Sequence, residues 1–303
     1  MHVVIAGGTG LVGTALTEEL LKAGHRVTIL TRDRDRDAAQ QQINGDVRYV
    51  EWLSGQQPEK ELEHVDAIIN LAGASISKRW TEKHKRDMMQ SRLRATRECI
   101  RIMRSLDKQP SIFMSASAVG YYGNSFSRTF TEESEPASDN FLQELSARWE
   151  KAAQEAEALP VRTVYLRFGL ILDPYEGALP KMMLPYQFWF GGPIGLGMQW
   201  YSWVHLQDVV RFILFALDSE KAEGVYNVTA PKPERMRVFG KKLSQVMERP
   251  HWFPVPVLLI RAVLGEMSLL VTDGQKVIPE KAKEAGFEFH YPELSEALVE
   301  ILK

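Results

Sequence analysis

Apolar runs alternate with amphipathic stretches along the first two-thirds of the chain. The apolar runs predict buried strands at 3–6, 26–31, 47–52, 66–71, 111–116 and 161–172. Residues 81–106 and 140–159 instead carry apolar side chains at helical spacing, and Pro110 and Pro160 follow their ends. This alternation predicts an α/β fold in which helices cover both faces of a doubly wound parallel sheet, as in the Rossmann fold.

A cluster of glycines directly follows the first predicted strand. The stretch VVIAGGTGLVG (3–13) leads into a helical pattern, so strand, glycine turn and helix occur in the order of a dinucleotide-binding unit. Glycine permits a tight turn and close approach of the backbone to a pyrophosphate. We therefore expect main-chain contacts to a nucleotide from Gly7, Gly10, Leu11, Val12 and Gly13. A purely structural glycine turn is the alternative.

The composition changes after Asp173, where Gly, Pro, Trp and Met become frequent. We expect a dinucleotide-binding domain at 1–173, to which 205–228 returns with a helix and a strand. Residues 174–204 and 229–303 would then form a smaller, mostly helical substrate-side domain. The apolar stretch 255–271 contains Pro256 and charged residues, which a bilayer helix would avoid. It predicts a buried helix pair, a lid element or an interface with a partner subunit.

Charge and cysteine content narrow the function classes. The 303 residues carry a net charge of −2, which favours neither nucleic acid nor an anionic membrane as a partner. The lone Cys99 excludes an internal disulfide and fits a core thiol. The seven histidines show no metal-ligand spacing. The chain enters a strand at once, without a leader pattern, so we expect a cytoplasmic protein that acts on a small molecule.

The end of the second strand indicates which nicotinamide cofactor is bound. An acidic residue there accepts hydrogen bonds from the ribose of NAD, whereas this strand ends in Thr31–Arg32. A guanidinium can pair with the 2′-phosphate of NADP. The sequence favours NADP(H) over NAD(H), with Arg34 or Arg36 assisting Arg32. The intervening aspartates at 33 and 35 could still reach the ribose.

Several segments together resemble the extended short-chain dehydrogenase/reductase superfamily. They are GGTGLVG (7–13), NLAG (70–73), SASAVGYYG (115–123), LRFGLIL (166–172) and SWVHLQDVV (202–210). INLAGASISKRW (69–80), SRLRAT (91–96) and the tail segments PVPVLLIRAVLGE and EAGFEFHYP are similar to its atypical "epimerase family" branch, the NAD(P)-binding epimerase/dehydratase-like proteins with a short extra C-terminal domain.

The resemblance implies several residue roles. It places Asn70, Ala72 and Gly73 beside the cofactor, and Ser115 and Ser117 beside the reacting oxygen of a substrate, with Ser117 the better match. Strand-end serines can equally satisfy backbone groups. A homodimer through helices 81–106 and 140–159 is a further expectation that the resemblance carries.

The superfamily's Tyr-x-x-x-Lys pair has no counterpart at the expected spacing. In relatives the tyrosine lies about 25 residues after the serine, where the lysine charge lowers the tyrosine pKa and enables proton transfer. Those positions are Leu142 and Ser146 here. Tyr122 is a candidate substitute for the proton donor, although it could equally be an aromatic wall.

Three further side chains are candidates for substrate binding. They are Arg79, Arg92 and His205, whose alternatives are surface ion pairing for the arginines and a structural hydrogen bond for the histidine. Two functions remain: an NADP(H)-dependent oxidoreductase or epimerase-like enzyme, which the Gly/Trp/Met-rich insert favours, or a nucleotide-binding sensor or partner-binding module with little turnover, which the missing pair favours.

Overall fold

A seven-stranded, all-parallel sheet forms the centre of the molecule. The computed structural model describes residues 1–39 and 47–303, with Arg36, Ala38 and Ala39 described by backbone alone. The strands lie in the order β3-β2-β1-β4-β5-β7-β11. Their bounds are β1 His2–Ala6, β2 Arg26–Thr31, β3 Val47–Glu51, β4 Ala67–Asn70, β5 Ile112–Ala118, β7 Arg162–Phe168 and β11 Gly224–Val228.

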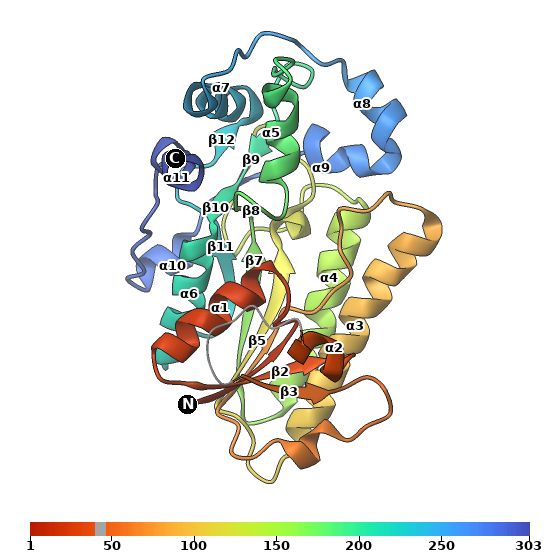
Figure 1. Ribbon diagram of the computed structural model, residues 1–303, viewed down its shortest axis with the longest axis vertical. Coiled ribbons are helices and arrows are strands. Elements are labelled where there is room, and N and C mark those ends of the chain that lie inside the picture. Colours follow the sequence, from red (N-terminus) through yellow and green to blue (C-terminus); the bar gives the residue numbers. More distant parts are fainter. Residues whose placement is uncertain (40–46) are drawn as a thin grey trace.

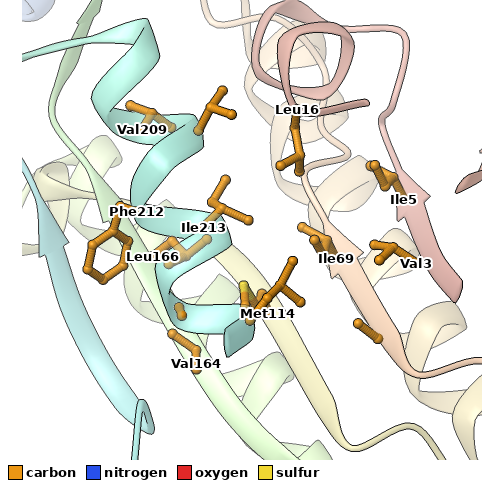
Figure 2. Packing of buried hydrophobic residues seen from close by; sticks show 14 of the residues in the cluster. Val3, Ile5, Leu16, Ile69, Met114, Val164, Leu166, Val209, Phe212 and Ile213 are labelled. Atoms are coloured by element: carbon orange, nitrogen blue, oxygen red, sulfur yellow. The ribbon is translucent and has the colours of Figure 1, made fainter. Parts of the chain in front are cut away.

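Helices cover both faces of this sheet, which confirms the doubly wound α/β fold. On one face α1 (Leu11–Lys22) packs against α6 (Leu206–Asp218), and on the other α3 (Glu82–Ser105) packs against α4 (Phe141–Ala153) (Figure 1). A short α2 (Arg34–Ala39) precedes β3. Figure 2 shows this buried cluster, with Leu16 of α1 on the side of Ile5 and Ile69 and Phe212 of α6 beside Leu166. Cys99 is buried within α3, as a core thiol requires.

The predicted strand at 161–172 is two strands, because the chain bends at Gly169. A Cβ at this position would overlap the carbonyl oxygen of Ser202. Only β7 therefore stays in the main sheet, while β8 (Leu170–Leu172) pairs with β10 (Trp203–His205). The periodicity of the run could not reveal the break, because both halves are apolar.

Most of the C-terminal part lies beyond the carboxyl ends of the sheet strands, whereas α10 (Glu280–Glu284) packs beside β11 at the edge of the sheet (Figure 1). This part has its own core, in which Tyr201, Phe239 and Leu298 are buried. Its elements are β6 Thr129–Phe130, α5 Leu179–Gln187, β9 Trp200–Tyr201, β12 Glu234–Arg235, α7 Met236–Met247, α8 Val257–Leu264, α9 Leu269–Thr272, β13 Lys276–Val277, α10 Glu280–Glu284 and α11 Leu294–Leu302. Short 3₁₀ turns include η2 (Val119–Tyr122) after β5 and η4 (Gly265–Ser268) between α8 and α9.

The stretch 255–271 matches the predicted buried helix pair only in its second part, where Leu269 and Leu270 pack against the apolar cluster around Trp80. None of the residues of α8 is buried, and Leu258 is 78% exposed. The apolar side chains of α8 that predicted burial form an outward face instead. No helix in the described part of the chain combines the length and the apolar character needed to cross a bilayer.

Candidate cofactor and substrate site

The glycine turn after β1 is built by backbone packing that leaves no space for side chains at two positions. A Cβ on Gly13 would overlap the carbonyl oxygen of Gly7, and a Cβ on Gly7 would lie 2.8 Å from the carbonyl carbon of Leu71. Gly7 also has a φ of +84°, which side chains rarely adopt. These glycines hold the turn after β1 against the turn after β4, at the point where the strand order reverses.

Gly10 differs from these glycines because the protein itself does not require its small size. A Cβ there would meet only the Gly7 carbonyl oxygen, at an ordinary 3.5 Å, and its φ is −92°. Gly10 caps the N-terminus of α1, which has no acidic residue in its first turn and no side-chain cap. The turn therefore presents unblocked helix N–H groups beside an open position, which is the cradle a pyrophosphate needs. Leu11 and Val12 follow as the first residues of α1.

The end of β4 is held in place from α3. The side-chain amide of Asn70 donates to Oγ1 of Thr96 at 2.9 Å, and its oxygen accepts the N–H of Ala72 at 3.2 Å. Gly73 faces Arg92, whose Cζ would lie 2.9 Å from a Cβ on this glycine. The NLAG segment thus forms a fixed wall next to the glycine turn.

The end of β2 offers an exposed cation. Arg32 is exposed, and its guanidinium pairs with no carboxylate within residues 1–39 and 47–303. Thr31 is buried and donates through Oγ1 to the carboxylate of Asp37. Arg34 is already engaged with Glu61 at 3.4 Å, and the side chain of Arg36 lies outside the described residues. Of these three arginines, Arg32 is therefore the one that the structure shows available for an anion.

Ser117 lies at the carboxyl end of β5 in a buried polar network that the sequence did not reveal. Its hydroxyl donates to Oε1 of Glu150 on α4 at 2.6 Å. Arg167 of β7 binds the same carboxylate with two hydrogen bonds of 2.8 Å, and both charged side chains are buried. Burial alone would lower the pKa of Arg167, but the hydrogen bonds and charge of Glu150 outweigh it and raise that pKa. The only sequence signal was one arginine inside the apolar LRFGLIL strand.

Tyr122 belongs to this network and is fully buried in η2. Its hydroxyl donates to Oδ1 of Asn227 and accepts from Nη1 of Arg167, both at 2.8 Å. Burial raises the pKa of Tyr122 to about 12, against the opposing charge of Arg167. The Tyr122 hydroxyl therefore already donates its one hydrogen bond to a group inside the protein, Asn227. Because the hydroxyl is enclosed and hydrogen-bonded to Asn227 and Arg167, this geometry favours a structural role for Tyr122 over that of a proton donor.

The two positions of the missing pair lie on α4 beside η2. A Cβ on Gly120 would lie 3.2 Å from Cβ of Leu142 and 3.6 Å from Oγ of Ser146. The Ser146 hydroxyl donates to the carbonyl of Leu142 at 2.9 Å. Leu142 packs in an apolar cluster with Trp80 of the loop before α3 and with Leu269 of α9. The wall on this side of the site is therefore apolar.

The remaining candidates, Arg92, Arg79, Ser115 and His205, differ in burial and in hydrogen-bond partners. Arg92 donates to the carbonyls of Ala74 and Met88 and lies 5.0 Å from the ring of Trp149, while desolvation lowers its pKa to about 10. No carboxylate pairs with it in the described chain. Arg79 is exposed, whereas Ser115 is buried and its hydroxyl donates to the carbonyl of Ala116 at 3.5 Å.

His205 lies apart from this network. It is buried, its Nδ1 accepts the N–H of Gln207 at the start of α6, and its Nε2 lies 2.7 Å from Glu300 of α11. Both ring nitrogens are occupied in joining α6 to α11, which favours the structural alternative for this histidine over substrate binding. No cluster of His, Cys, Asp or Glu able to hold a metal exists among the described residues.

Comparison with known proteins places the chain in a family. Residues 3–229 match the NAD dependent epimerase/dehydratase family, and residues 255–301 match a domain of unknown function, DUF1731. The chain belongs to the NAD dependent epimerase/dehydratase family. This confirms the family resemblance.

Close relatives cover the full length of the chain. It is 46% identical to Epimerase family protein YfhF of Bacillus subtilis, over all of this chain and 98% of that protein. It is 43% identical to Epimerase family protein SSP1921 of Staphylococcus saprophyticus, over 99% of each. Among solved structures, human epimerase family protein SDR39U1 (isoform 2) with NADPH is 31% identical, with a TM-score of 0.88 over 100% of this chain and 99% of the human one.

Proposed function

We propose that this chain binds NADP(H) and acts as an oxidoreductase or epimerase on a small carbonyl or alcohol substrate. The observation that carries the proposal is the open position at Gly10. In the same turn, Gly7 and Gly13 have no room for a Cβ, whereas Gly10 does. A protein that needed only a tight turn would have no use for this space. The solved NADPH complex of the human relative supports the same ligand class.

The preference for the phosphorylated cofactor rests on Arg32. Its exposed guanidinium follows β2, whose neighbour β1 carries the glycine turn. A guanidinium there can bind a phosphate with two charge-assisted hydrogen bonds, whereas a ribose hydroxyl gains little from it. Gly7, Gly10 and Gly13 with Asn70, Ala72 and Gly73 would hold the remainder of the dinucleotide through main-chain groups.

When bound, the nicotinamide supplies or accepts a hydride. The chain's own residues determine how a substrate is held. The Ser117 hydroxyl donates a hydrogen bond to Glu150. Its oxygen lone pairs therefore face away from the carboxylate and can accept a hydrogen bond from a substrate hydroxyl. Arg92, desolvated and without a carboxylate, can bind an anionic group of the substrate.

The apolar wall at Leu142 favours a second function. Tyr122 is enclosed, and Leu142 and Ser146 occupy the two positions where the family's tyrosine and lysine would stand. A protein that binds the dinucleotide as a sensor of the redox state, or to dock a partner, needs no proton donor.

One experiment separates the two functions. NADPH oxidation is followed with sugars, quinones and small carbonyl compounds, with Ser117→Ala as the matched control, while calorimetry records NADPH binding. Turnover that Ser117→Ala lowers supports the enzyme. Binding with no turnover across the screen supports the sensor, and absence of binding contradicts both.

A further inference from the structure

Aromatic and aliphatic side chains gather on one exposed part of the C-terminal region. Two segments, 179–198 and 249–264, provide them. We call these side chains the apolar-cationic face, which comprises Leu184, Phe188, Trp189, Phe190, Leu196, Met198, Trp252, Phe253, Leu258, Leu259 and Val263 with Lys181, Arg249 and Arg261. Among the aromatic side chains, Phe188 is 65% exposed and Trp252 is 70% exposed. A folded protein rarely leaves such a set in water without a use.

Direct contacts join the two segments into one surface. Nε1 of Trp252 donates to the carbonyl of Trp189 at 2.9 Å. The rings of Phe190 and Phe253 meet edge to face, with centroids 6.0 Å apart. The N–H of Gly195 donates to the carbonyl of Val255 at 2.9 Å, directly before α8. Figure 1 places α8 at the periphery of the molecule, away from the sheet.

Helix α8 continues this surface with an outward face of its own. Leu258, Leu259 and Val263 are 78%, 54% and 64% exposed, and they recur at the spacing of one helix face together with Ala262. Packing inside the protein does not explain these side chains, because α8 buries none of its residues. Burial of this apolar face against another apolar surface would therefore add to the stability of α8.

The charges on this surface are of one sign. Segments 179–198 and 249–264 contain Lys181, Arg249 and Arg261 but no Asp or Glu, in a chain with 39 acidic residues. Arg249 lies 4.8 Å from the ring of Trp189. Acidic residues flank the two segments: Glu248 is exposed directly before Arg249, and Glu266, just beyond α8, pairs at 2.8 Å with Lys85, which also pairs with Glu82 at 2.7 Å. Exposed indole and leucine side chains beside cations, in two segments that themselves carry no acidic residue, are the chemistry that binds an anionic lipid surface.

We propose that the apolar-cationic face docks this protein reversibly on a bilayer that contains anionic phospholipid. A second copy of the chain is a poorer occupant, because two-fold pairing of this face would bring its cations against one another. The overall charge of −2 concealed this feature, since the acidic residues that balance the cations lie elsewhere in the chain. The sequence-based expectation of no membrane partner rested on that overall charge.

Co-sedimentation of the full chain with vesicles tests this proposal. We expect binding to vesicles of equal parts phosphatidylglycerol and phosphatidylcholine, and about tenfold weaker binding to phosphatidylcholine alone. Arg261→Glu should weaken binding to the anionic vesicles at least about tenfold. Leu258→Asp should do the same, because it places a charge where an apolar side chain enters the interface. Both residues are exposed, so both variants should keep the wild-type circular dichroism spectrum.

Tyr175→Asp is the matched control, because Tyr175 is 88% exposed and lies outside the face. It should bind vesicles like the wild type. Failure of the wild type to sediment with anionic vesicles, or equal losses in Tyr175→Asp and Leu258→Asp, would overturn the proposal. A dimer in lipid-free sedimentation that Leu258→Asp dissociates would also overturn it and assign the face to a second copy. None of these outcomes depends on cofactor binding.

Discussion

The hydroxyl of Ser117 donates to Oε1 of Glu150 at 2.6 Å, so the strand-end serine of this family member is tied to a buried carboxylate on α4. The same carboxylate binds Arg167 through both of its oxygens. Three elements, β5, α4 and β7, therefore meet in one charged contact beneath the candidate substrate site. The position of Ser117 depends on this ion pair.

Glu150→Gln should destabilise the protein by about 3–5 kcal/mol, because it leaves the buried guanidinium of Arg167 without its counter-ion. Urea unfolding measures the loss as a shift in the midpoint. Glu144→Gln is the control on the same helix: this glutamate pairs with Arg148 at 2.7 Å, and both side chains are more than half exposed. Its cost should stay within about 0.5 kcal/mol. Equal losses of unfolding free energy in the two variants would show that the buried ion pair contributes no more to stability than the exposed one.

Gly10→Val and Gly13→Val should fail in different ways. At Gly10 the structure has room for a side chain, so the variant should keep its melting temperature but lose both NADPH and NADH, since the valine fills the space beside the pyrophosphate. At Gly13 the added Cβ would overlap Gly7 and Gly8, so that variant should melt lower or fail to fold. Calorimetry and thermal melts distinguish the two. Retained nucleotide binding in a folded Gly10→Val protein would show that the glycine turn does not bind the pyrophosphate.

The fold was accessible from the sequence because its signals are local. Each strand of the sheet is a short apolar run, and the glycines follow the first one directly. The network around Ser117 was not accessible, because Glu150 and Arg167 are 17 residues apart and meet only when α4 packs against the sheet. Composition alone also misled at α8, since apolar residues indicate a buried face without showing what buries it. Long-range polar contacts and surface exposure both require tertiary structure.

Arg32→Ala should weaken NADPH binding about tenfold or more and change NADH binding little, because only NADPH carries the 2′-phosphate. Titration of both cofactors measures the ratio. Arg34→Ala is the control, since Arg34 already pairs with Glu61 at 3.4 Å. If Arg32→Ala lowers the affinities for NADPH and NADH equally, Arg32 does not recognise the 2′-phosphate and the proposed NADP preference is wrong.

Stability should fall as the pH drops below about 6.5, and His2 should account for part of the fall. Burial, reinforced by the charge of Arg26, lowers the pKa of His2 below its model-peptide value of 6.5, although the Glu63 carbonyl opposes this. The unfolded chain then binds a proton that the native chain does not, so protonation favours unfolding. His2→Gln should flatten the dependence of the urea midpoint on pH between about 5.5 and 7.5. An unchanged slope in this variant would assign the effect to other groups.

Tyr122→Phe distinguishes a structural tyrosine from a proton donor. Removing the hydroxyl leaves Nη1 of Arg167 and Oδ1 of Asn227 unpaired in a buried site, which should cost about 1–3 kcal/mol of stability. NADPH affinity should persist, because the glycine turn does not contact this hydroxyl. For any substrate that the NADPH oxidation screen finds, the rate at a temperature where the variant is folded should stay within about threefold of the wild type, whereas loss of general acid–base catalysis would lower it about 100-fold or more. A loss of that size with unchanged stability would return Tyr122 to the chemistry and require its ring to leave the network during turnover.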